Sequence, residues 1–287
     1  MSHASTHNKI DTLQDRAAML AQSRAFFAKR QVMEVDCPIL TQGASVDAHI
    51  DLMPAIYSHK ETRYLHSSPE YGMKRLLSDG IGDIYQLSHV FRDGESSPKH
   101  NPEFTMCEWY RKGFSFENMI EETLDYIRLF LGKLPSETYS YRQLFQMHTN
   151  LDYLQLKEDD LLAYCKKENI PFYEEVATEG KDAILNIILG TKIEPKLGNG
   201  KLTVLAYYPS TQAALAKTRN IQGEEVAERF EVYFQGVELA NGYHELADPQ
   251  EQRKRFEEAN DFRIQLGKKT LPLDEHFLAA LEQGLPD

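Results

Sequence analysis

The chain has 287 residues, 26% of them charged, and a formal net charge of −12. This length supports one large domain or two small ones, and no apolar run is long enough to span a bilayer. The acidity, and the lack of any Lys/Arg-rich block, argue against a protein that grips a whole tRNA, because phosphate contacts dominate such binding. We therefore expect a globular protein with neither a membrane nor a tRNA partner.

The amino terminus and the cysteines bear on where the protein works. The first residues have no apolar core and no small-residue cleavage site, so we expect no secretory signal and a disordered tail over residues 1–11. Cys37, Cys107 and Cys165 are isolated, without the paired spacing of a zinc site or a disulfide framework. Reduced thiols and a cytoplasmic location follow as expectations.

The first predicted elements are a helix and two short strands. Thr12-Leu13-Gln14-Asp15 has the form of a capping box, which predicts a helix from Thr12 to about Arg30. Residues 31–35 favour a short strand. The mixed stretch that follows predicts a loop with another short strand near residues 50–53.

A second helix is predicted to begin in the stretch Ser67-Ser68-Pro69-Glu70. Pro69 suits the first helical turn, Ser67 or Ser68 suits the N-cap, and Glu70 is favoured near the positive end of the helix dipole. Capping alone would explain Ser68 and Glu70. A helix N-terminus that faces a pocket exposes its cap residues, so capping and substrate binding are compatible.

The chain next predicts two antiparallel strands joined by a polar loop. Residues 84–91 are apolar and end at Arg92, and a second apolar run starts at Phe104. Such a hairpin brings together Arg92, Asn101, Glu103, Phe104, Glu108 and Tyr110. An arginine, an aromatic ring and several carboxylates suit a nucleotide polyphosphate with its metal and a cationic co-substrate.

The middle of the chain carries fewer functional signals. A helix is predicted from Ser115 to Gly132, with Ser115 as its cap and Gly132 at its end. Residues 139–225 are expected to form an inserted or decorating segment. Within it we predict helices near residues 141–148, 159–167 and 181–189 and a strand at 202–207.

A second hairpin is predicted over residues 226–248, with a turn at Gln235-Gly236. Glu238 and Glu245 would face opposite sides of an unbroken strand, and a one-residue bulge at Asn241-Gly242 would turn both to one face. Two such carboxylates suit a divalent cation, whereas solvent-facing glutamates on an edge strand are the alternative. Asp248-Pro249 then predicts the start of a charged, mostly solvated helix to about Leu266.

Several strings resemble one family. Arg92 followed by HNPEFT (100–105) and EWY (108–110) resembles the second signature motif of class II aminoacyl-tRNA synthetases, lysyl branch. The helix, strand and proline over residues 12–38 resemble the first motif, which implies a homodimer. SSPEYGMKRLL (67–77) and GVELANGYHEL (236–246) resemble the same branch. The implied fold is α+β, an antiparallel sheet flanked by helices in one catalytic domain over residues 12–287.

The resemblance also implies an activity. We expect no anticodon-reading barrel, and a free-standing lysyl-type domain is similar to the elongation factor P–lysine ligase family. That family implies activation of lysine or β-lysine by ATP and Mg²⁺ as an adenylate, followed by transfer to a lysine side chain of elongation factor P. Chemistry of this kind works by positioning and charge stabilisation, without a covalent enzyme nucleophile.

Residue roles follow from the matching motifs. Arg92 would neutralise the α-phosphate, Phe104 would stack on adenine, and Glu238 with Glu245 would hold Mg²⁺. The remaining nucleotide-binding set implied is Asp93, Gly94, Glu95, His100, Asn101 and Leu239. The substrate-binding set implied is Glu108 and Tyr110 for the far ammonium of lysine, and Ser68, Pro69, Glu70, Asn241 and Glu245 for the other amine.

Two departures from the family pattern shape the hypotheses. The lysyl branch often has an acid two positions after the motif arginine, whereas this chain has Gly94 there and Glu95 next. The sequence lacks the glycine-rich third motif, whose arginine contacts the γ-phosphate, so a C-terminally truncated fold is expected. The hypotheses are therefore a ligase, a catalytically impaired lysine- or nucleotide-binding module, and a truncated lysyl-tRNA synthetase.

Overall fold

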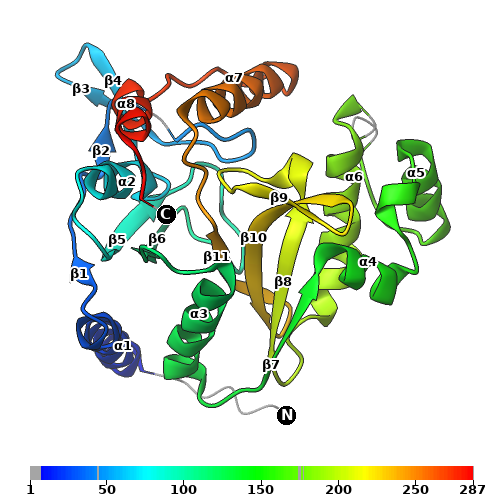
Figure 1. The fold of residues 1–287 in the computed structure, drawn as a ribbon, viewed down its shortest axis with the longest axis horizontal. Helices are drawn as coiled ribbons and strands as arrows, with labels where there is room; N and C mark the ends of the chain where they lie inside the picture. Colours follow the sequence, from blue (N-terminus) through cyan, green and yellow to red (C-terminus); the bar gives the residue numbers. More distant parts are fainter. Residues whose placement is uncertain (1–7, 44, 174–175, 177, 287) are drawn as a thin grey trace. The chain divides into compact units, whose positions relative to one another are not determined.

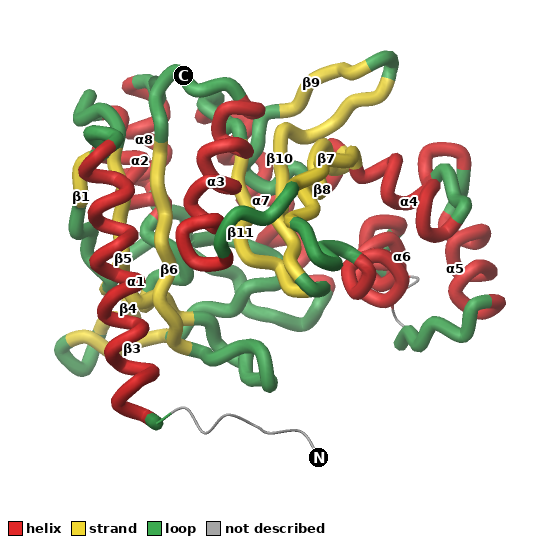
Figure 2. The backbone as a smooth tube through the Cα atoms, turned by 90° about the horizontal axis from the view of Figure 1, so that it is seen from below, coloured by secondary structure: helices red, strands yellow, loops and turns green. Residues whose placement is uncertain are grey.

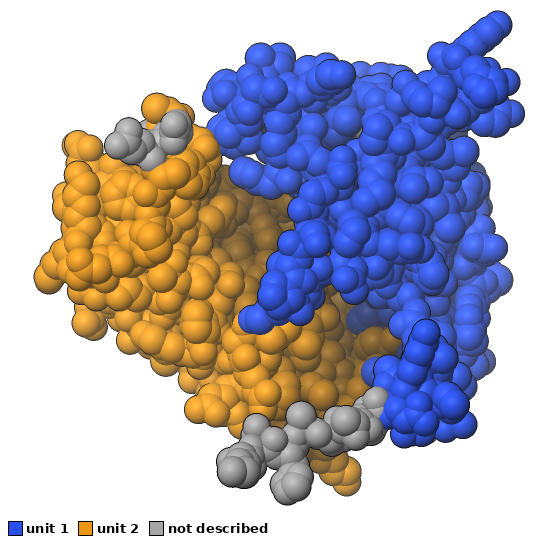
Figure 3. Space-filling model, turned by 180° about the vertical axis from the view of Figure 1, so that it is seen from behind, with its two compact units in different colours: residues 1–114, 247–287 blue, residues 115–246 orange. Residues whose placement is uncertain are grey.

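The computed structural model describes residues 8–43, 45–173, 176 and 178–286 (Figure 1). The chain divides into two compact units, unit 1 (residues 1–114 and 247–287) and unit 2 (residues 115–246), which Figure 3 distinguishes by colour. Both units combine helices with largely antiparallel sheets, which confirms the predicted α+β class. Across the described residues, no helix is both long and apolar enough to cross a membrane.

Unit 1 carries two small sheets and the helices that pack on them. Its elements are α1 (Lys9–Lys29), β1 (Met33–Glu34), β2 (Leu40–Thr41), β3 (Pro54–Tyr57), β4 (Glu61–Leu65), α2 (Glu70–Ser78), β5 (Ile84–Phe91), β6 (Glu103–Tyr110), α7 (Pro249–Gln265) and α8 (Glu275–Gln283). One sheet has the order β1-β5-β6 and the other the order β2-β4-β3. Strand β1 runs parallel to β5, and the other pairs in these sheets are antiparallel.

The N-terminal and C-terminal parts of unit 1 share a core. The ring of Tyr71 on α2 stacks on Phe277 of α8 with centroids 4.3 Å apart. Figure 2 shows α1 alongside β6, where the Phe27 ring lies 5.5 Å from that of Trp109. The C-terminal helix α8 thus packs against α2, which belongs to the first part of the chain.

The start of α1 corrects a prediction. Asn8 is the N-cap, and its side chain accepts a hydrogen bond from the Ile10 amide at 3.3 Å. Thr12 lies inside the helix and donates to the Asn8 carbonyl at 3.5 Å, so the capping box predicted at Thr12 is wrong. Of the tail predicted over residues 1–11, positions 1–7 lie outside the described residues and 9–11 are helical.

The strand predicted at residues 50–53 is also wrong. The Asp47 carboxylate accepts the amides of His49 and Ile50 at 2.7 and 2.9 Å, and this local turn competes with strand pairing. Asp51 forms only an isolated bridge, and regular pairing begins at β3. The strand predicted at 31–35 is confirmed only for the two residues of β1.

The two elements that carry most of the predicted site in unit 1 lie where expected. Helix α2 begins at Glu70 with Pro69 as its N-cap, within one residue of the prediction. Strands β5 and β6 pair without interruption from Ile84↔Tyr110 to Phe91↔Glu103. Each successive residue of β6 therefore has a fixed partner on β5.

Unit 2 is built on a five-stranded sheet. Its elements are α3 (Phe116–Leu131), β7 (Ser136–Ser140), α4 (Tyr141–Thr149), η1 (Tyr153–Gln155), α5 (Glu158–Lys167), α6 (Lys181–Ile188), η3 (Leu189–Ile193), η4 (Glu194–Lys196), β8 (Leu202–Pro209), η5 (Ser210–Gln212), β9 (Thr218–Ile221), β10 (Glu224–Phe234) and β11 (Val237–Tyr243). The sheet order is β11-β10-β8-β7, with β9 also paired to β10. The predicted helices and strand of this region are confirmed, including the Ser115 cap and the Gly132 end of α3.

The sheet of unit 2 buries both faces. One face packs on α3 through Phe116, Ile120 and Phe230, and the other packs on α4, α5 and α6 around Tyr141 and Tyr208. Strand β8 lies inside residues 139–225 and occupies a central position in the sheet. The segment expected to decorate the domain therefore also supplies one of its internal strands.

The β10–β11 hairpin has the predicted turn and a misplaced bulge. Gln235 and Gly236 have φ of 51° and 69°, the left-handed pair that joins strands through a tight two-residue turn. Val232 pairs with Ala240 and Tyr233 with Glu238, so Leu239 is the extra residue. The bulge predicted at Asn241-Gly242 is wrong in position, because backbone pairing in these strands stays regular past Asn241.

Gly242 generates a stability prediction. A Cβ at Gly242 would lie 2.4 Å from Cε1 of Phe230, whose ring is fully buried against Phe116. We expect Gly242→Ala to lower the free energy of unfolding by about 1–3 kcal/mol through overpacking. Urea denaturation would measure the loss, and Phe230→Leu in the same chain should recover part of it. Additive losses in the double variant would contradict this explanation.

Candidate functional site

A hydrogen-bonded carboxylate marks the substrate side predicted in unit 1. Ser68 Oγ donates to Glu108 Oε2 at 2.6 Å, and the Tyr110 hydroxyl donates to Glu108 Oε1 at 2.8 Å. Ser68 precedes α2, whereas Glu108 and Tyr110 lie on β6. The fold thus joins predicted residues that are 40 positions apart in the chain around one acid.

The start of α2 fixes this arrangement. Ser68 Oγ also accepts the Glu70 amide at 3.0 Å, so its hydroxyl proton points to Glu108. Glu70 forms an ion pair with Lys74, whose side chain is fully buried. Ser68 therefore serves both the helix and the candidate site, because its hydroxyl accepts the first helical amide and also orients the Glu108 carboxylate.

A buried thiol below this acid is excluded as a nucleophile. Burial raises the pKa of Cys37 to about 11, with Arg75 opposing the shift and Glu108 adding to it. The Cys37 backbone amide donates to Gln86 Oε1 at 2.8 Å. At neutral pH the thiol remains protonated, as expected for a site that works by positioning.

The surroundings of Arg92 are those of an arginine that could bind an anion. Its guanidinium lies 5.2 Å from the Phe104 ring centroid, and its Nη1 lies 3.8 Å from Glu95 Oε1. Within the part of the chain that the structure describes, Arg92 Nε is buried and has no hydrogen-bond acceptor. A buried donor without a partner is costly, and a phosphate oxygen would satisfy it.

The loop between β5 and β6 carries the other predicted nucleotide contacts. The Asp93 amide donates to the Asp51 carbonyl at 2.8 Å, and Gly94 has φ of 77°. His100 Nδ1 lies 3.0 Å from Ser97 Oγ, and Asn101 is exposed to solvent. Their roles toward a nucleotide remain predictions.

The predicted residues of unit 2 lie on β11 and just after it. Cross-strand pairing aligns Glu238 with Tyr233 and Asn241 with Glu231, so Glu238 and Asn241 share a face. Leu239 is the bulged residue and is 43% exposed. Glu245 follows β11 and bridges to Ala216.

The bulge at Leu239 lies between Glu238 and Glu245, as the bulge predicted at Asn241-Gly242 would have done. An extra residue between Glu238 and Glu245 changes the parity of the strand, so the seven-residue separation no longer forces the two acids apart. Two carboxylates and the phosphates of a nucleotide form an ordinary donor set for Mg²⁺. Over the described residues there is no group of three or more His, Cys, Asp or Glu that could hold a metal without such a ligand.

The predictions missed a buried polar row on the same face of β10. Arg229 Nη2 donates to Glu231 Oε1 at 2.6 Å, and the Tyr233 hydroxyl donates to Glu231 Oε2 at 2.6 Å. Burial opposes the charge of Arg229, but Glu231 keeps the arginine pKa above its ordinary value. The signal in the sequence is the alternation of polar and apolar residues from Arg229 to Phe234, in the part of β10 that pairs with the strand carrying Asn241 and Glu238.

Comparisons with known proteins identify the family of the chain. A family model described as tRNA synthetases class II (D, K and N) matches residues 2–287. The elongation factor P–(R)-beta-lysine ligase of Haemophilus influenzae (strain PittGG) is 40% identical over 100% of this chain and 89% of the relative. The proteins of the same name from Avibacterium paragallinarum and Klebsiella pneumoniae (strain 342) are 41% and 40% identical over 97% of this chain, and over 87% and 86% of the relatives. The chain therefore belongs to the class II tRNA synthetase family (D, K and N), on the branch of the elongation factor P–(R)-beta-lysine ligases.

Proposed function

We propose that this protein activates lysine or β-lysine with ATP and transfers the acyl group to a lysine side chain of elongation factor P. The names of its relatives give the substrate class. The structural observation that carries the proposal is the Glu108 carboxylate held by Ser68 and Tyr110, since an oriented acid suits an ammonium substrate.

The proposed reaction has two balanced steps. In the first, a carboxylate oxygen of the amino acid attacks the α-phosphorus of ATP, and pyrophosphate leaves with the bonding electrons. In the second, the neutral amine of the acceptor lysine attacks the acyl carbon, AMP leaves, and the amine releases a proton. Neither step requires a covalent bond to the enzyme, so positioning and charge neutralisation supply the catalysis.

Each predicted residue has a definite task in this proposal. Glu108, with its two hydroxyl donors, fixes the far ammonium of the amino acid, and Glu70 and Ser68 hold the other amine. Arg92 directs its buried Nε–H and its other donors at the α-phosphate, where negative charge develops in the first step. Phe104 supplies a flat face for the adenine ring.

The metal would be held from unit 2. Glu238 and Glu245 would bind Mg²⁺ together with the phosphates of ATP, and Asn241 would contact the amino acid. Bound there, Mg²⁺ would neutralise charge on the polyphosphate and assist the departure of pyrophosphate. The contribution of the protein would be to present one acid on β11 and the other just after it, with the Leu239 bulge between them.

A direct test of this function follows pyrophosphate exchange into ATP and acyl transfer to an acceptor. We expect exchange that depends on lysine or β-lysine, acceptance by elongation factor P and no acceptance by tRNA. Arg92→Ala and Glu238→Gln should each reduce exchange by about a hundredfold or more, because each removes charge stabilisation from the transition state.

Each contrary result selects another hypothesis. Lysine binding without any exchange would identify a lysine- or nucleotide-binding module. Acylation of tRNA in preference to elongation factor P would identify a tRNA-charging enzyme.

Glu108 generates a separate prediction on substrate affinity. Glu108→Gln keeps the shape but removes the charge that faces the ammonium, a loss of about 2 kcal/mol, which corresponds to a rise of roughly thirtyfold in the KM for the amino acid. The KM for ATP should stay unchanged. Steady-state exchange kinetics would measure both constants.

Glu103→Gln is the matched control for this variant. Glu103 lies on the same strand, is exposed, and pairs with His89 at 2.8 Å. Although the hairpin brings it near Arg92, this proposal gives it no contact with a ligand. It should have wild-type kinetics. An equal loss in both variants would show that any charge removed from β6 matters, and would contradict the role of Glu108.

We further infer a homodimer in the cytoplasm, with α1 in the dimer interface. Only Ser23, Phe26 and Phe27 of the 21 residues of α1 are buried. Ile10 and Leu13 of this helix are 59% and 56% exposed. An apolar surface of this kind favours burial against a second chain.

Light scattering after size-exclusion chromatography would test the dimer. We expect the native protein to elute with the mass of two chains and Leu13→Glu to elute as one. Glu is isosteric enough to leave the helix intact but is costly to bury unpaired. A monomeric native protein, or an undisturbed dimer in Leu13→Glu, would remove this helix from the interface.

A further inference from the structure

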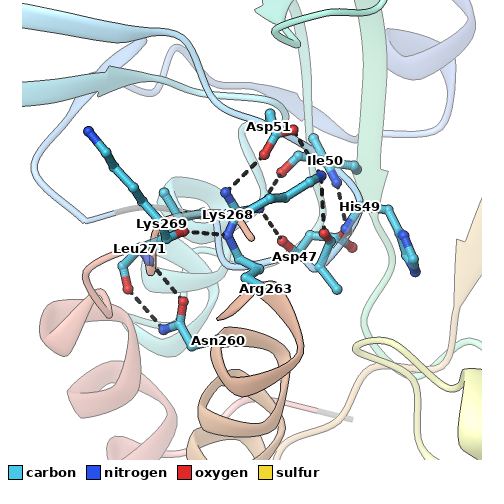
Figure 4. Close-up of polar contacts among 10 residues, drawn as sticks. Asp47, His49, Ile50, Asp51, Asn260, Arg263, Lys268, Lys269 and Leu271 are labelled. Carbon is cyan, nitrogen blue, oxygen red and sulfur yellow. Dashed lines mark hydrogen bonds and ion pairs between the residues drawn. The ribbon is translucent and has the colours of Figure 1, made fainter. Parts of the chain in front are cut away.

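Arg263 is a buried arginine on a helix that the sequence predicted to be mostly solvated. It lies in the last turn of α7 and is 4% exposed. Its guanidinium makes four hydrogen bonds, from Nε to the Lys269 carbonyl, from Nη1 to the carbonyls of Asp47 and Ile50, and from Nη2 to Asp51 Oδ1 (Figure 4). The distances are 2.9, 2.9, 3.3 and 2.9 Å in that order.

Three of these four acceptors belong to one folded segment, residues 47–51, here called the 47–51 loop. The Asp47 carboxylate accepts the amides of His49 and Ile50, which curls the loop. In Figure 4 the oxygens of Asp47, Ile50 and Asp51 converge on the Arg263 guanidinium. The loop has no regular strand pairing of its own, so Arg263 provides much of its support.

Two neighbours of Arg263 strengthen this contact. Lys268 Nζ lies 2.9 Å from Asp51 Oδ2 and donates to the Ala48 carbonyl at 3.4 Å. Asn260 fixes the following segment by exchanging two hydrogen bonds with the Leu271 backbone at 2.9 and 2.8 Å. Burial raises the pKa of Asp51, but hydrogen bonds from Lys268 and Arg263 outweigh it and hold that pKa below its ordinary value.

The 47–51 loop is joined directly to the backbone that carries Arg92. The Asp51 carbonyl accepts the Asp93 amide at 2.8 Å, and the Arg92 amide donates to the Pro102 carbonyl at 2.9 Å. The main chain at Arg92 is therefore tied on one side within its own hairpin and on the other side to the 47–51 loop. Only the second tie depends on α7.

We propose that Arg263 is a positioning residue for Arg92. Arg263 fixes the 47–51 loop, the Asp51 carbonyl of this loop accepts the Asp93 amide, and this contact holds Arg92 in the position that binds the nucleotide. Arg263 itself contacts no substrate in this scheme. The inference rests on the proposed function, in which Arg92 stabilises charge on the α-phosphate. Lysine is a poor substitute at position 263, because one ammonium lacks the planar fork that reaches acceptors on both sides.

The test compares Arg263→Met, Arg263→Lys and Asp51→Asn in pyrophosphate exchange, with concentrations corrected by active-site titration. We expect Arg263→Met to reduce kcat/KM for ATP by about ten- to a hundredfold, the scale of a displaced positioning group, with the KM for the amino acid unchanged. Arg263→Lys should recover only a small part of the loss. Asp51→Asn combined with Arg263→Met should cost no more than the worse single variant, since both break the same contact.

Arg253→Met is the matched control. Arg253 lies on the same helix and forms an ion pair between helices, with Glu275 on α8, at 2.5 Å. It pairs with a carboxylate outside the 47–51 loop and is more exposed to solvent than Arg263, so the kinetics of Arg253→Met should match those of the native protein. Equal losses in Arg253→Met and Arg263→Met would overturn the positioning role in favour of general destabilisation.

Further outcomes separate this inference from the proposed function. A strong loss in Arg92→Ala with native kinetics in Arg263→Met would overturn the inference alone. Native exchange in Arg92→Ala would overturn the assigned role of Arg92, whatever Arg263 does. If Arg263→Met fails to fold, Lys268→Met tests the same loop from a partly exposed side chain, and an unchanged KM for ATP in both Lys268→Met and Asp51→Asn would overturn the inference.

Discussion

An uninterrupted antiparallel register joins β5 to β6, and the candidate chemistry of unit 1 depends on it. Because every residue of β6 has a fixed partner, Phe104 and Glu108 are separated by a set distance along one strand. Arg92 follows directly where β5 ends, so Arg92, proposed for the phosphate, and Glu108, proposed for the ammonium, belong to opposite ends of the same hairpin. A slip of one residue would move all of these side chains to the other face.

In the β10–β11 hairpin, the alignment of the candidate site residues depends on a bulge. Strand β11 must present Glu238 and Asn241 on the face that carries Glu231 and Tyr233, and the bulge at Leu239 sets that alignment. The buried row of Arg229, Glu231 and Tyr233 is internally hydrogen-bonded, which removes most of the cost of burying its charges. This face of β10 can therefore carry polar side chains while Phe230 and Val232 pack in the apolar core on the opposite face.

Much of this could be predicted from local signals. The bounds of β5 and α3 and the turn at Gln235-Gly236 followed from apolar runs, capping residues and glycine, all of which act over a few positions. The bulge was misplaced because pairing between strands decides which residue is extra, and one strand alone does not contain that information. Thr12-Leu13-Gln14-Asp15 has the spacing of a capping box, but the side chain that accepts a helical amide belongs to Asn8, four residues earlier.

The burial of Arg263 could not be predicted from its local sequence. The helix that carries it is rich in charged residues, which predicts a solvated helix. Three of its four acceptors lie more than 200 positions earlier in the chain. Only tertiary contacts distinguish it from the exposed arginine at Arg253. Glu108 was found from sequence because a family pattern named it, but its pairing with the Ser68 hydroxyl was visible only in three dimensions.

The division of unit 1 into two sequence segments has a consequence for biosynthesis. Residues 115–246 leave the ribosome as a continuous block and contain every strand of their own sheet, so they are able to fold before α7 is made. The 47–51 loop, in contrast, is translated early and meets its arginine only after that whole block has emerged. The contacts between Arg263 and the 47–51 loop are thus among the last long-range contacts to form during synthesis.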